Sequence, residues 1–85
     1  MINKDNLIAW SQFLYELEDA KDHLAALISD IQSDSDYREE ELRVDLGHIF
    51  DHLNRAWNSR NNDVGVHNQK WEAMSKFPTD IEPVG

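Results

Sequence analysis

The sequence predicts an all-α fold: a long antiparallel helical hairpin with a short C-terminal helix and tail, pairing with a second copy as a dimeric four-helix bundle. Two observations predict this fold. Apolar residues recur at alternating steps of three and four along residues 7–31 and again along residues 42–56, which is the spacing of one helix face. A short polar turn separates the two segments, and helices joined by a short turn pack as antiparallel neighbours.

The first predicted helix runs from about residue 5 to 32. We expect Asn3 or Asp5 to precede it, because both side chains accept hydrogen bonds from the free amides of a first turn. Its polar face, which includes Glu16 and Asp19, is expected to be solvated. Its apolar series is Leu7, Trp10, Leu14, Leu17, Leu24, Ile28 and Ile31, interrupted at Lys21.

The turn and the second helix follow directly. Residues 33–36 read Ser-Asp-Ser-Asp, and such side chains bond their own backbone and end helices. Asp36 followed by Glu39 resembles a capping box for a second helix from about 37 to 60. The apolar series of this helix is Leu42, Leu46, Ile49, Leu53 and Ala56.

The two apolar series also predict a register and an assembly. Folding the chain about its turn places Trp10 near Trp57 and Leu17 near Phe50. Each stripe is broader than one partner helix covers, so we expect a homodimer. Two alternatives stay open: a monomer in which the C-terminal segment covers the stripe, and a protein that keeps the stripe for a different partner.

The chain is predicted to be a single domain. Residues 1–63 form the hairpin, and residues 64–85 form a connector, a short helix within 67–76 and an extended tail. The tail segment contains Trp71 and Phe77, which are costly to leave in water. It is therefore expected to dock on the open end of the hairpin or on a partner chain.

Composition narrows the range of partners. The 85 residues include 8 Lys and Arg against 17 Asp and Glu, a net charge of −9, and no cysteine. Phosphate binding requires clustered basic side chains, so we expect neither nucleic acid nor an anionic membrane as a partner. A basic protein partner fits this charge. The polar N-terminus and the short apolar runs predict a cytoplasmic protein without a membrane span.

Histidines and carboxylates offer an alternative based on metal binding. His48 and His52 are four residues apart and share one helix face, as in two-histidine metal sites. Asp45-x-x-His48 resembles the carboxylate-x-x-His pair of di-iron bundles, whose facing helix supplies a further ligand; Glu16, Asp19 or His23 is the candidate for it. The competing interpretation is that these side chains flank the contact between the helices and are solvated. The candidate metal ligands are Glu16, Asp19, Asp45, His48 and His52.

A second pattern concerns nucleotide hydrolysis. Glu16-x-x-Asp19 resembles half of the motif set of the MazG and dUTPase-like pyrophosphatases, all-helical dimers with magnesium sites on neighbouring helices. The resemblance implies a metal-dependent nucleotide hydrolase. The other half of the pattern is missing, because Glu41 and Asp45 are four residues apart rather than three. In architecture alone, the hairpin also resembles the small RNA-binding hairpin dimers of plasmid copy control.

The sequence as a whole favours a non-catalytic interaction or regulatory module without a cofactor. Tryptophan is enriched where binding energy concentrates at interfaces, so the large aromatic residues are candidates for partner contacts, with core packing as the alternative. An antitoxin, immunity or nucleic-acid-mimic role is also compatible with the charge. The candidate contact residues are Trp10, Phe50, Trp57, Trp71 and Phe77.

Overall fold

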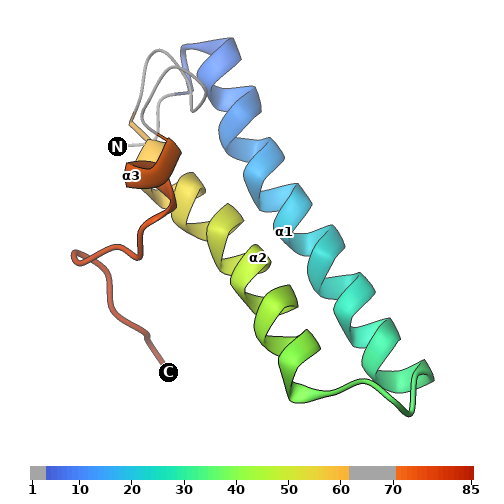
Figure 1. The fold of residues 1–85 in the computed structure, drawn as a ribbon. Coiled ribbons are helices and arrows are strands. Elements are labelled where there is room, and N and C mark those ends of the chain that lie inside the picture. The colour runs from blue at the N-terminus through green and yellow to red at the C-terminus, as the bar shows by residue number, and fades with distance from the viewer. Residues whose placement is uncertain (1–3, 62–70) are drawn as a thin grey trace.

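The computed structural model describes residues 4–61 and 71–85, and it shows an antiparallel helical hairpin (Figure 1). The helices are α1 (Leu7–Ser33), α2 (Glu39–Ser59) and α3 (Trp71–Ser75). Helices α1 and α2 pack along their length, and α3 packs on α2. All regular secondary structure in the described ranges is helical, which confirms the predicted all-α hairpin. Residues 67–70 of the predicted short helix lie outside the described part of the chain.

The start of α1 is fixed by a side chain other than the two predicted ones. Asn6 is the N-cap, and its Oδ1 accepts a hydrogen bond from the Ala9 amide at 3.1 Å. Asn6 therefore satisfies one of the free amides of the first turn. Asp5 does not cap the helix, and Asn3 lies outside the described residues.

The predicted capping box at the start of α2 is wrong. The N-cap is Arg38, which makes no side-chain capping bond. The side chain of Asp34 stabilises the preceding turn, because its Oδ1 accepts a hydrogen bond from the Asp36 amide at 2.9 Å.

The interface between α1 and α2 is narrow and rich in alanine. Leu27 and Ile49 are its large buried apolar residues, and Tyr37, Leu42 and Leu46 pack around them. Among the described residues, the other buried apolar side chains are all alanines: Ala9, Ala20 and Ala56. Small side chains let two helix backbones approach, but they bury little apolar surface.

The predicted contact line on α1 is displaced by one residue. Leu24 and Ile28, both in the predicted series, remain 44 % and 49 % exposed. The residues of α1 that are buried lie one position earlier: Ala9, Glu16, Ala20 and Leu27. The apolar series therefore flanks the contact with α2 rather than forming it.

The register also differs from the predicted one. Pairing Leu17 with Phe50 would place Asp19 opposite His48 and His23 opposite Val44. In the structure Asp19 contacts His52, and His23 contacts His48. Helix α2 is thus shifted by one helical turn along α1.

The C-terminal segment docks on the second half of α2, on the side away from α1 (Figure 1). Asn58 Nδ2 donates to the carbonyls of Met74 at 2.7 Å and Lys76 at 2.9 Å, and Asn54 Nδ2 donates to that of Ser75 at 2.8 Å. These bonds satisfy carbonyls at the end of a five-residue helix that could not persist alone. Within the described residues, none of the helices has the length and apolar character needed to cross a membrane.

Candidate functional site

A cluster of charged and imidazole side chains lies where the middle of α1 meets α2. We call it the polar cluster: Glu16, Asp19 and His23 from α1, with His48, His52 and Arg55 from α2. Glu16, His52 and Arg55 are each only 4–5 % exposed. Buried charges destabilise a fold unless they are paired and hydrogen-bonded, so the contacts of these three residues explain how the cluster is tolerated.

Arg55 neutralises Glu16 inside the hairpin. Its Nε donates to Glu16 Oε2, and its Nη2 donates to Oε1 at 3.4 Å. Asp51, one turn earlier on α2, is a weaker contact at 3.5 Å from Nη1. Helix α3 also contacts Arg55. The centre of the Trp71 ring lies 4.1 Å from the Arg55 guanidinium, and Ser75 Oγ accepts a hydrogen bond from Arg55 Nη1 at 3.2 Å.

His52 connects this ion pair to the other imidazoles. Its Nδ1 lies 2.7 Å from Glu16 Oε1. Its Nε2 lies 2.8 Å from Asp19 Oδ2 and 3.3 Å from His48 Nε2. Both ring nitrogens of His52 therefore face carboxylate oxygens, and a carboxylate accepts a hydrogen bond only from a ring nitrogen that carries a proton.

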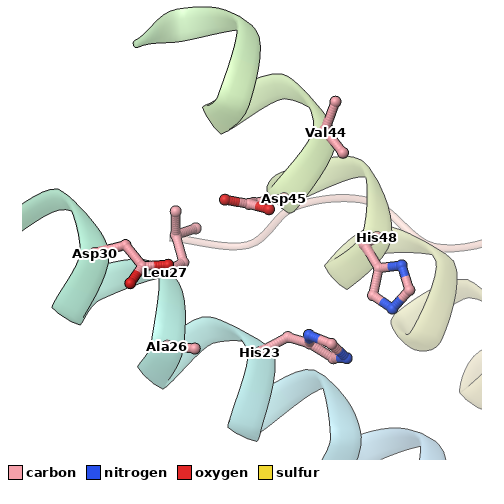
Figure 2. A pocket seen from close by; sticks show the side chains of 7 residues that line it. All are labelled: His23, Ala26, Leu27, Asp30, Val44, Asp45 and His48. Atoms are coloured by element: carbon pink, nitrogen blue, oxygen red, sulfur yellow. The ribbon is translucent and has the colours of Figure 1, made fainter. Parts of the chain in front are cut away.

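Three imidazoles meet beside this point. The ring centroids of His23 and His48 are 4.3 Å apart, and those of His48 and His52 are 4.9 Å apart. Figure 2 shows His23 of α1 and His48 of α2 projecting toward each other between the two helices, and their rings meet edge-on. They border a pocket that is also lined by Ala26, Leu27, Asp30, Val44 and Asp45. Three nitrogens, one from each ring, lie within 4.8 Å of one another.

The structure brings four of the five predicted metal ligands together in this cluster: Glu16, Asp19, His48 and His52. Asp45 lines the same pocket, but its carboxylate accepts a hydrogen bond from the Tyr37 hydroxyl at 2.6 Å. Partial burial raises the pKa of the Tyr37 phenol above its ordinary value, and the bond to Asp45 raises this pKa further. Asp45 is therefore bonded to Tyr37, which follows the turn between α1 and α2.

Two sequence-based expectations about the cluster are wrong. The sequence places Glu16 on the solvated face of α1 and His52 at the edge of the contact, yet both are buried. The sequence pattern also gave no indication of the roles of Arg55 and Ser75. The signal that could have identified Arg55 is its spacing, because it lies one turn beyond His52 and next to Ala56 of the apolar series.

The five candidate contact residues do not form one aromatic group. Phe50, Trp71 and Phe77 remain 43 %, 52 % and 65 % exposed. Each has a separate neighbour among the described residues: Trp10 stacks on Phe13, Trp57 on Arg60, Trp71 on Arg55, and Phe50 packs edge-on against Phe77.

In comparisons with known proteins, no family model, curated protein or solved structure matches this chain. The function is therefore argued from the surface and the polar cluster alone.

Proposed function

We propose that this chain is a small acidic helical interaction module that acts as a homodimer, through protein–protein contacts and without catalysis. In the proposed assembly two hairpins pack into a four-helix bundle. The observation that supports it most directly is an apolar face that α1 and α2 share and that the described part of the chain leaves half exposed. We call this the apolar face: Leu17, Leu24, Ile28 and Ile31 of α1 with Phe50 and Leu53 of α2, each 38–49 % exposed.

Helix geometry places these residues on one side of the hairpin. Leu17 and Ile28 each follow a buried residue of α1, as Phe50 and Leu53 each follow a buried residue of α2. Successive residues turn by about 100° around a helix. In two antiparallel helices that contact each other, the residues one step beyond the contact line therefore point to the same side of the pair.

The side of the hairpin that carries the apolar face is large enough for a dimer interface. A 27-residue helix is about 40 Å long, and two helices about 10 Å apart present a side roughly 20 Å wide. The whole side is therefore on the order of 800 Å², which is what each partner contributes to an interface of standard size. The apolar face, from Leu17 to Ile31 of α1, covers about half of that length. The thin, alanine-rich core of the hairpin gives a further reason to bury this face.

The polar cluster lies toward the opposite side. His48 and Asp19 each precede a buried residue, Ile49 and Ala20, so they point away from the apolar face. A dimer formed through the apolar face leaves this side free. With a net charge of −9 per chain, that free surface would attract a basic protein partner by long-range electrostatics.

The hydrolase alternative has less support. A magnesium-dependent hydrolase needs carboxylates that are available to the metal. Here Arg55 and His52 engage both oxygens of Glu16. Asp45 is bonded to Tyr37. The hydrolase function stays a prediction, and the interaction module is the better supported function.

The mass of the protein in solution tests the proposal. Size-exclusion chromatography with light scattering should give twice the 9.9 kDa mass of the chain. Ile28→Glu places two charges in the symmetric interface, one from each copy. Burying a charge without a partner is unfavourable, so the dimer dissociation constant should rise at least tenfold, about 1.4 kcal/mol or more.

Ile8→Glu is the matched control, because Ile8 lies on the same helix and is 67 % exposed. It precedes buried Ala9, so it faces away from the apolar face, and its substitution should leave the dimer intact. A wild-type chain that runs as a monomer at high micromolar concentration would refute the proposed assembly. Equal weakening by both substitutions would place the interface elsewhere.

A further inference from the structure

We propose that His23, His48, His52 and Asp19 form a binding site for one divalent transition-metal ion, with zinc as the ion that fits best. The site lies between α1 and α2, and each helix supplies two of the four ligands. The proposal does not depend on the dimer. The metal ligands lie at the contact between the helices and on the side away from the apolar face.

Three of the distances between the ligand atoms are close to those of tetrahedral coordination. Bonds from zinc to nitrogen or carboxylate oxygen are about 2.0–2.2 Å long, so neighbouring ligands in a tetrahedron are roughly 3.3 Å apart. His48 Nε2 and His52 Nε2 are separated by 3.3 Å. Asp19 Oδ2 lies 2.8 Å from His52 Nε2 and 3.6 Å from His23 Nε2. The three imidazole nitrogens lie within 4.8 Å of one another, and side-chain rotations that bring the more distant ones closer complete the bonding geometry.

The scaffold holds the four ligands from rigid elements. Asp19 and His23 are separated by one turn of α1, and His48 and His52 by one turn of α2. Each pair therefore projects from one helix face toward the other helix. A pair of histidines alone is weak evidence for a metal site. Three imidazoles and one carboxylate that converge from two helices give a complete ligand set for zinc.

The residues around the ligands are those that a histidine–metal site needs. A metal-bound histidine commonly donates its second N–H to a carboxylate, which fixes the ring and its tautomer. Glu16 Oε1 lies 2.7 Å from His52 Nδ1 and is suited to this role. Arg55 in turn fixes Glu16. Glu16, one of the ligands predicted from sequence, thus supports a ligand instead of binding the ion, and His23 takes its place.

An ion can reach the site from solvent. The side chain of His23 is 43 % exposed, whereas that of His52 is 7 % exposed. His23 and His48 border the pocket shown in Figure 2. The chain's net charge of −9 favours the approach of cations. Four protein ligands fill a tetrahedral shell, which is typical of zinc sites that stabilise a fold.

Zinc titration of the purified, chelator-treated chain tests the site. Isothermal calorimetry should show one Zn²⁺ per chain. Free Zn²⁺ at a hundredfold excess over its dissociation constant should raise Tm by roughly 10 °C or more. Co²⁺, used as a spectroscopic probe, should give the intense visible absorption of a tetrahedral complex. Mg²⁺, which prefers six oxygen ligands, should shift Tm little.

Two variants and a control locate the ion. His23→Gln and His48→Gln change exposed side chains, so they should keep the helical circular dichroism spectrum and weaken Zn²⁺ binding at least tenfold. Asp45→Asn is the matched control, because Asp45 lines the same pocket and is a ligand candidate from sequence, yet the variant should bind Zn²⁺ as wild type does. No Zn²⁺ binding by the wild type, or unchanged binding by both histidine variants, would overturn the site. Loss of binding in Asp45→Asn alone would overturn the ligand set of three histidines and Asp19.

Discussion

The two halves of the hairpin are held together by different chemistry. In the half next to the turn, which we call the loop half, Leu27 and Ile49 are buried with Tyr37, Leu42 and Leu46 around them. In the half toward the helix ends, the open half, the largest buried side chains include Glu16, His52 and Arg55. The loop half thus contains an apolar core, and the open half contains the buried ion pair of the polar cluster, whose His23 and His48 lie near the middle of the hairpin.

The two halves contribute differently to the stability of the hairpin and to the register between its helices. Apolar contacts are non-directional, and a series spaced by three and four repeats after each turn. Sliding α2 by one turn therefore places apolar residues against apolar residues again. The contacts of Glu16 with Arg55 and His52 are directional, and a slide of one turn would leave buried charges unpaired. We infer that the open half selects the register that the loop half stabilises.

The largest predicted loss of stability comes from disrupting the polar cluster. Arg55→Met removes the charge that pairs with Glu16 and leaves a buried carboxylate without its main partner. Removing one member of a buried ion pair costs about 3–5 kcal/mol, a large part of the stability of a small domain. Urea unfolding followed by circular dichroism should show this loss in the free energy of unfolding.

Two further variants separate the pair from the arginine itself. Arg43→Met removes an exposed pair with Glu39, whose side chains are 80 % and 86 % exposed, so it should cost no more than about 0.5 kcal/mol. Glu16→Leu combined with Arg55→Met should be more stable than Arg55→Met alone, because no unpaired charge remains. A double variant as unstable as the single one would mean that Arg55 acts through packing on Trp71 instead.

The next largest loss of stability is expected from a substitution in the loop half. Leu27 is 4 % exposed, and Leu27→Ala would leave a cavity beside Ile49. Such a change typically costs about 2–5 kcal/mol, and the lower end is expected because the narrow core can partly collapse. The same urea titration measures it. A larger loss of unfolding free energy in Leu27→Ala than in Arg55→Met would contradict this expectation. The loop half would then dominate both the stability and the register of the hairpin.

Sequence reasoning predicted the hairpin but not its contact line. The apolar spacing and the short turn were sufficient to place both long helices. They could not show that Ala9 and Ala20 face α2 while Leu24 and Ile28 flank it, because alanine carries almost no hydrophobic signal. Close approach of the backbones favours the small residues, and this preference depends on how both helices are positioned together.

The candidate site could be predicted only in part, because its contacts also depend on how the two helices are positioned together. The i,i+4 spacing identifies His48 and His52, and Glu16, Asp19 and His23 are the facing candidates. Which of these candidates meet the two histidines depends on the register, which was predicted one turn away from the observed one. The pair of Arg55 with Asp51 is visible within one helix, whereas the ion pair of Arg55 with Glu16 joins two helices. Local patterns do not contain such long-range contacts.

The smallest effect concerns the turn that joins the two helices in the loop half. Burial and the bond to Asp45 raise the pKa of the Tyr37 phenol above its ordinary value of 10.0. In the unfolded chain this phenol ionises near pH 10, while in the folded chain it stays protonated to higher pH. The unfolded state therefore loses its proton first. The stabilisation is fully present below pH 10 and falls as the pH rises above it.

Tyr37→Phe removes this dependence. At pH 7 we expect a loss of stability smaller than that of Leu27→Ala, since the variant keeps the ring and loses one partly exposed hydrogen bond. Between pH 9 and 11 the urea midpoint of the variant should fall less steeply than that of the wild type. Tyr15, which is 64 % exposed, provides the control, because Tyr15→Phe should leave the wild-type slope unchanged. Equal slopes in all three proteins would show that the bond between Tyr37 and Asp45 does not constrain the turn in solution, and the loop half would then be held by its apolar contacts alone.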